Sequence, residues 1–78
     1  MYRWRRSSKA VTPTSVVITY TSPDTDLTIE SRKRYHVSHC GIQSSVKFVV
    51  MEQDVVIGIT GTLREAQRYA EEMDNAFI

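Results

Sequence analysis

Apolar and polar residues alternate in three segments between residues 15 and 51, and this period of two is typical of β-strands with one covered face. The predicted strands are residues 15–21, 27–37, 45–51 and 55–59. The last of them is nearly all apolar, which favours a position at the centre of the sheet or covered on both faces. Turn-forming residues separate the segments, so we expect an antiparallel sheet.

The apolar spacing changes after residue 62 to steps of three and four, which is the period of one helix face. The apolar positions in these steps are Leu63, Ala66, Ala70, Met73 and Phe77. Thr62 and Glu65 have the T-x-x-E spacing of a capping box, in which each side chain satisfies a backbone N–H group at the helix start. The pattern therefore predicts a helix over residues 63–75.

Strands followed by one helix predict an α+β fold with two layers. We expect an antiparallel sheet of three to four strands that is packed by the C-terminal helix, in the order ββββα, as a single domain over residues 11–78. Residues 1–10 show neither period, and we expect them to form a flexible basic N-terminal arm.

The composition limits the chemistry of the chain. Its 78 residues make one small domain, 41% of them hydrophobic, and we expect the core to use the large apolar side chains that a closed cofactor pocket would need. A single cysteine excludes an intramolecular disulfide and favours a reducing compartment. No apolar run approaches the length of a membrane span, so we expect a cytoplasmic protein with no membrane partner.

The chain contains one cluster of metal-ligand residue types, formed by His36, His39 and Cys40. A structural zinc site uses four ligands, and a second cysteine or a third histidine is missing, so this cluster needs carboxylates or another chain to hold a metal. The simpler interpretation is a polar strand end and turn. No nucleophile, acid–base pair or complete phosphate loop is recognisable, and we predict no metal, no cofactor and no catalytic residues.

Two basic clusters are candidate binding residues for a partner protein or a nucleic acid. In the first, arginines alternate with aromatic residues, and guanidinium groups pair with phosphate whereas aromatic rings stack on bases. Its candidates are Arg3, Trp4, Arg5 and Arg6. In the second, Arg32, Arg34 and His36 share one face of a predicted strand. The alternatives are a solvated tail for the first cluster and a charge-protected edge strand for the second.

Acidic residues gather on the predicted helix, where Glu65, Glu71 and Glu72 are candidate contacts for a partner protein. A solvated acidic face is the alternative, because Arg68 lies three and four residues before two of these glutamates.

The charges divide the chain into two unlike parts. Residues 1–50 carry eight Lys or Arg and three acids, whereas residues 51–78 carry two and six. A small domain with charge of both signs and no catalytic constellation favours a non-enzymatic protein-binding module that docks on a larger protein or complex. Its build resembles that of small phage-encoded inhibitors, including anti-CRISPR proteins. This resemblance covers the architecture only and implies an inhibitor of a host complex.

The alternative function is nucleic-acid binding. A basic arm before strands and a helix is similar to the arm-binding domains of tyrosine recombinases and to AP2-like domains, which lay a sheet in the DNA groove. That resemblance implies that Arg32, Arg34 and His36 meet phosphates and base edges, and that the N-terminal arginines follow the backbone. The chain differs from those DNA-binding domains in its additional fourth strand and in its small net charge of +1. A homodimer is a further expectation, because an open sheet has edges to cover.

Overall fold

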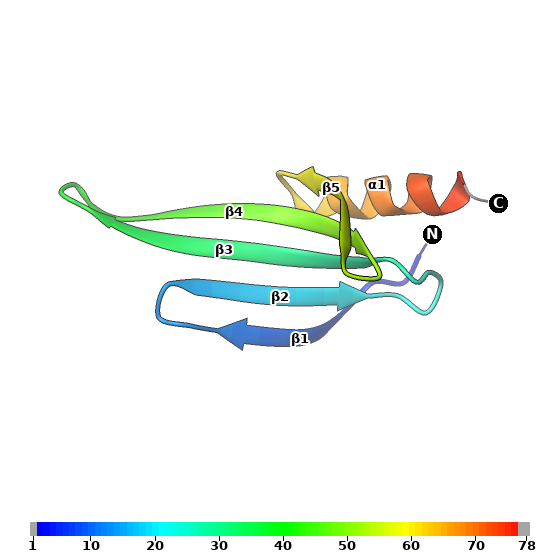
Figure 1. Ribbon diagram of the computed structural model, residues 1–78, viewed down its shortest axis with the longest axis horizontal. Helices are drawn as coiled ribbons and strands as arrows, with labels where there is room; N and C mark the ends of the chain where they lie inside the picture. Colours follow the sequence, from blue (N-terminus) through cyan, green and yellow to red (C-terminus); the bar gives the residue numbers. More distant parts are fainter. Residues whose placement is uncertain (1, 77–78) are drawn as a thin grey trace.

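The computed structural model describes residues 2–76 and has the predicted α+β architecture, with one sheet and one helix in two layers (Figure 1). The elements are β1 (Arg5–Val11), β2 (Ser15–Thr21), β3 (Thr28–Ser38), β4 (Gly41–Glu52), β5 (Val55–Thr60) and α1 (Leu63–Asn75). All strands are antiparallel, and each pairs with its neighbour in the chain, so the order in the sheet is β1-β2-β3-β4-β5. The predicted helix is confirmed, and Phe77 lies outside the described residues.

The structure corrects the prediction of a flexible arm over residues 1–10 and of at most four strands. β1 forms a fifth strand that pairs with β2 from Arg5 opposite Thr21 to Val11 opposite Val16, with one irregularity between Arg6 and Ser8. Every residue of β1 is exposed, so its sequence has no apolar alternation. Backbone hydrogen bonds to β2, rather than burial of its own side chains, hold this strand in the sheet.

β5 also lies elsewhere than its apolar sequence predicts. It is the other edge strand of the sheet, and Val55, Val56 and Ile59 are exposed. The helix follows directly from β5 and covers only one face of it, and of the four large apolar residues of β5 only Ile57 packs against the core.

The core lies between α1 and one end of the sheet. Ile29 of β3 and Val50 of β4 pair in register, are fully buried, and form one cluster with Leu27 and the helix residues Ala66 and Ala70. Partly buried side chains that pack around this cluster are Trp4, Tyr20, Phe48, Ile57, Leu63, Tyr69 and Met73. The helix contacts β3, β4 and β5 only.

Local sequence signals fix the start of the helix and the turn between β4 and β5. Thr62 caps the helix, because its Oγ1 accepts a hydrogen bond from the backbone N–H of Glu65 at 3.2 Å. Gln53 and Asp54 join β4 to β5 with φ angles of 48° and 67°, the left-handed conformation that a two-residue hairpin loop of type I′ requires.

β3 and β4 reach far beyond the helix. They contain 11 and 12 residues, are joined by the two-residue turn His39–Cys40, and make the molecule 50 Å long against 21 and 19 Å in the other directions (Figure 1). From Arg34 to Lys47 every residue is exposed. We call residues 34–47 the projecting hairpin. The one helix among residues 2–76 is too short and too polar to cross a membrane.

Candidate functional surfaces on the projecting hairpin

The two faces of the projecting hairpin differ in chemistry because successive strand residues point to opposite sides of the sheet. Ile29 and Ser31 of β3 are buried on the side of the sheet that α1 covers. Tyr35 and Val37 continue this side beyond the helix, whereas Arg32, Arg34 and His36 face the opposite, helix-free side.

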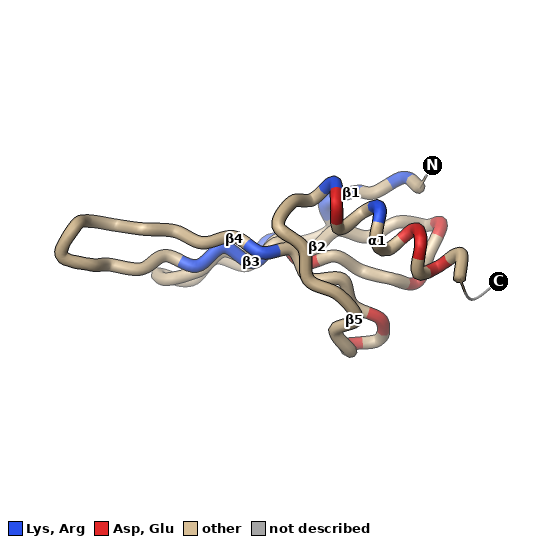
Figure 2. Tube along the Cα trace, turned by 90° about the horizontal axis from the view of Figure 1, so that it is seen from above, with Lys and Arg blue, Asp and Glu red and all other residues tan. Residues whose placement is uncertain are grey.

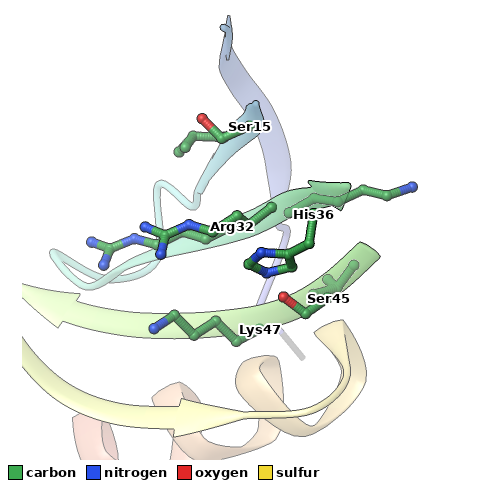
Figure 3. A pocket seen from close by; sticks show the side chains of 9 residues that line it. Ser15, Arg32, His36, Ser45 and Lys47 are labelled. Carbon is green, nitrogen blue, oxygen red and sulfur yellow. The ribbon is translucent and has the colours of Figure 1, made fainter. Parts of the chain in front are cut away.

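Strand register gathers cationic side chains on the helix-free face. Arg32 lies opposite Lys47 of β4, and Arg34 lies between Ser15 of β2 and Ser45 of β4. Figure 3 shows Arg32 and Lys47 extending from neighbouring strands, with His36 and Ser45 beside them. These side chains line a shallow depression of about 300 Å³. We call it the cationic hollow; Lys33 borders it, and its other polar lining residues are Ser15, Arg32, Arg34, His36, Ser45 and Lys47.

The cationic hollow has more positive than negative charge. Arg32 is partly neutralised, because its Nη2 lies 2.9 Å from Oε1 of Glu30 on the same strand. Arg34 and Lys47 form no ion pair with any residue in the range 2–76. Arg32 and Lys47 are directly opposite like charges, an arrangement that destabilises a strand pair. An anion in the hollow would therefore relieve this repulsion.

Charge is also separated along the molecule. Lys and Arg mark β3 and β4 near the cationic hollow, whereas Asp and Glu concentrate at the end that holds α1 (Figure 2). The small net charge of +1 consequently hides a local excess of positive charge on the helix-free face.

The opposite face of the projecting hairpin is apolar and uncovered. Val37 and Ile42 pair across β3 and β4 and are 86% and 75% exposed. Tyr35 and Val46 are the other exposed apolar residues of this face, and the exposed Val11 of β1 lies on the same side of the sheet. We call these five residues the apolar strip. Its neighbouring charge is Lys33, whose Nζ lies 5.2 Å from the centre of the Tyr35 ring.

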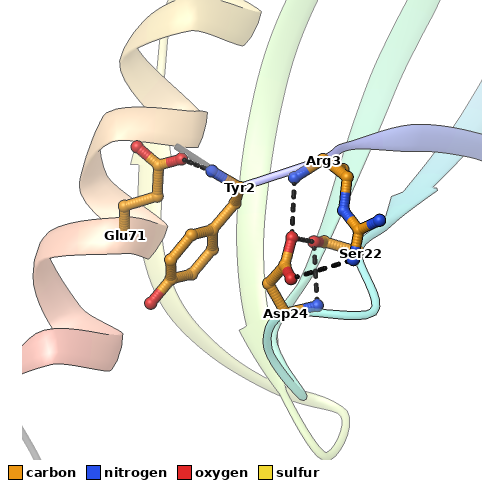
Figure 4. A network of polar contacts seen from close by, with 5 residues as sticks. All are labelled: Tyr2, Arg3, Ser22, Asp24 and Glu71. Carbon is orange, nitrogen blue, oxygen red and sulfur yellow. Dashed lines mark hydrogen bonds and ion pairs between the residues drawn. The ribbon is translucent and has the colours of Figure 1, made fainter.

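The N-terminal candidates lie far from the cationic hollow, at the helix end of the molecule. Arg3 donates its backbone N–H to Oδ2 of Asp24 at 2.9 Å, and its guanidinium lies 3.4 Å from Oδ1 (Figure 4). Trp4 packs against the core, so its ring does not project as a free stacking platform. Arg5 and Arg6 are exposed on β1. The structure thus separates the two basic clusters that the sequence suggested.

The acidic candidates do not form one surface either. Glu65 and Glu72 are exposed, one at each end of α1. Glu71 is half-buried, and its Oε1 accepts the backbone N–H of Tyr2 at 3.0 Å (Figure 4). Its carboxylate therefore holds residues 2–4 against the helix.

Two pKa shifts reflect this docking of residues 2–4. The pKa of Tyr2 is raised to about 12. The largest cause is the hydrogen bond that its hydroxyl donates to Asp74, and loss of solvent and the negative charges of Asp74 and Glu71 add to it. The backbone N–H and then the guanidinium of Arg3 lower the pKa of Asp24 below its ordinary value. Because the folded-state pKa of Asp24 is depressed, its stabilising effect is complete above the ordinary aspartate pKa and is lost as pH falls through the folded value.

We expect residues 2–4 to detach from the domain on acidification because Asp24 then becomes neutral. Trp4 is the only tryptophan, so its fluorescence reports the detachment as a red shift. Asp24→Asn should be red-shifted already at neutral pH and lose most of the pH response. Asp26→Asn, in the same turn, is the matched control and should behave as the parent protein. Identical pH profiles for the parent and Asp24→Asn would contradict this assignment.

Sequence reasoning missed Lys47, Ser15, Ser45 and the apolar strip as site residues. The missing information was the strand register, which brings Lys47 opposite Arg32. Within residues 2–76, no group of three His, Cys, Asp or Glu residues is placed to hold a metal ion. Cys40 is an exposed free thiol at the hairpin turn.

Comparisons with known proteins do not assign the chain to a family. No protein-family model, curated protein sequence or solved structure gives a significant match.

Proposed function

We propose that the protein is a small non-enzymatic protein-binding module that contacts its partner through the apolar strip. The observation that carries this proposal is the exposure of Val37 and Ile42, 86% and 75%, side by side on a hairpin that projects from the domain. Single exposed apolar residues are ordinary, but contiguous ones on a protruding element are typical of protein interaction sites.

Charge around the apolar strip indicates the chemistry of the partner. Lys9 and Lys33 are the charged residues of β1–β4 that lie on this side of the sheet near the strip, and the carboxylate of Glu30 belongs to the opposite face. Complementary potentials favour a partner surface with an apolar centre bordered by Asp or Glu side chains. The narrower expectations, a phage-encoded inhibitor of a host complex and a cytoplasmic location, remain predictions.

Site-specific photocrosslinking tests the proposal. A photoreactive phenylalanine analogue replaces Val37 in the apolar strip or, as a control, the exposed Glu72 of α1, and nuclease-treated extract of the source cells is irradiated with each variant. We expect a crosslinked protein from position 37 only, joined through a peptide rich in apolar and acidic residues. Adding Lys33→Glu should reduce its yield roughly 10-fold, because like charges then oppose each other.

Other crosslinking results would exclude the proposal. Crosslinks from position 37 only to a second copy of the chain would indicate a homodimer, and the apolar strip would be its interface. The same product from both positions, or a product whose yield Lys33→Glu does not change, would show that the strip does not select a partner.

A further inference from the structure

We propose that the cationic hollow on the opposite face binds the phosphodiester backbone of a nucleic acid duplex. The side chains that carry this inference, Arg32, Arg34 and Lys47, point to the opposite side of β3 and β4 from the apolar strip, although Lys33 and Val46 border both surfaces. The proposed site keeps Arg32, Arg34 and His36 from the sequence-based expectation and adds Lys47, but it leaves out the N-terminal arginines, which are not part of the hollow.

The charges of the hollow match a ligand with several negative groups. Arg34 and Lys47 are exposed and have no ion-pair partner in residues 2–76, and Arg32 is only partly neutralised by Glu30. Arg32 and Arg34 are two residues apart on one strand face, which separates them by about 7 Å along the strand. They can therefore contact successive anionic groups of an extended polyanion, whereas a single small anion would satisfy only part of the set.

The hydroxyl and imidazole groups of the hollow also favour phosphate over a protein surface. Ser15 and Ser45 flank Arg34 in register and present hydroxyl groups, and His36 presents ring nitrogens beside Ser45 (Figure 3). Phosphate oxygens commonly accept hydrogen bonds from Arg, Lys and Ser side chains. Seven of the nine residues that line this hollow are of polar or charged type, and no acidic residue is among them, a composition that suits a protein–nucleic acid interface better than the apolar or aromatic centre of a protein interface.

The shape of the molecule allows a duplex to reach the hollow. The projecting hairpin carries no helix on either face, and its last residues form a ribbon of only two strands. The hollow itself lies where β2, β3 and β4 are paired, so the backbone of a duplex would rest across this face of the sheet. The acidic residues of α1 lie at the end of the molecule away from the tip of the projecting hairpin, and the basic residues of β3 and β4 lie between the two (Figure 2).

Salt dependence of binding tests the proposal. We expect a fluorescently labelled DNA duplex of about 20 base pairs to bind, with a slope of log affinity against log salt of about −2 to −3, as for two to three phosphate contacts. Affinity should then fall roughly 15- to 60-fold between about 50 and 200 mM salt.

Two matched double variants locate the binding surface. Arg34→Gln with Lys47→Gln should make the slope less negative by about two, because two phosphate contacts are lost. Arg64→Gln with Arg68→Gln on α1 removes the same charge from exposed positions and should leave the slope unchanged. All four substituted side chains are exposed, and circular dichroism checks that each variant is folded.

Three results would overturn the proposal. The first is absence of duplex binding at about 50 mM salt, where phosphate contacts are strong. The second is an equal change of slope in both double variants, which would mean that overall charge and not the hollow drives binding. The third is displacement of the duplex by polyglutamate at equal charge concentration, which would identify an acidic polypeptide as the ligand.

Discussion

Replacing Ile29 by alanine is expected to lower the free energy of unfolding by about 2–5 kcal/mol, whereas the same change at Ile42 should cost less than about 0.5 kcal/mol. Ile29 is fully buried between the sheet and α1, so its truncation leaves a cavity, but Ile42 is 75% exposed and loses little burial. The total stability of a domain of this size is on the order of 4–12 kcal/mol, so Ile29→Ala removes a large share of it.

Urea denaturation followed by circular dichroism measures both variants. The matched chemistry makes the comparison informative, because the two substitutions delete the same atoms from neighbouring strands. Similar losses for Ile29→Ala and Ile42→Ala at several protein concentrations would mean that the apolar strip is part of the core, contrary to the structure. A loss for Ile42→Ala that grows with protein concentration would instead reveal self-association through the strip.

Replacing Gly58 by alanine is expected to destabilise the domain by about 1–3 kcal/mol, a typical cost of overpacking. A Cβ atom at position 58 would lie only 2.8 Å from Cζ of Tyr69 and 2.9 Å from Cδ1. The ring cannot move away easily, because its hydroxyl donates a hydrogen bond to the backbone carbonyl of Ile57 at 2.6 Å.

Gly61 provides the matched control for this substitution. A Cβ atom there would contact nothing within 4 Å, and its backbone is not in the left-handed region, so Gly61→Ala should change stability by less than about 0.5 kcal/mol. A double-mutant cycle checks the cause: in a Tyr69→Leu background, Gly58→Ala should cost much less than in the parent. An undiminished cost in that background would exclude the ring as the obstacle.

The sequence predicted the elements whose signals are local. The helix from Leu63 to Asn75 and its cap at Thr62 are as expected, because the cap and the apolar period lie within one segment. β1 was not predicted because all its side chains are exposed, so its sequence has no apolar alternation. Only its backbone pairing with β2 identifies it as a strand. The same cations that suggested a flexible arm are typical of an edge strand that must not pair with other chains.

The two surfaces of the projecting hairpin needed information that spans strands. Arg32 and Arg34 were recognisable as one face of a strand, but their grouping with Lys47 depends on the register set by the turn at His39–Cys40. The apolar strip is uncovered because the helix is shorter than the strands. A helix of 13 residues spans about 20 Å, whereas a strand of 12 residues spans about 40 Å. Val37 and Ile42 continue the apolar pattern, but α1 is too short to cover them.

The succession of neighbouring strands also has a consequence for how the protein folds. Each hairpin closes a short loop with the strand before it, so the sheet can assemble stepwise during synthesis at little entropic cost. Residues 2–4 behave differently, because Tyr2 meets Glu71 across 69 positions of the chain. On the ribosome residues 2–4 are made before α1 and must wait until α1 has emerged, and their docking completes the native state of the domain.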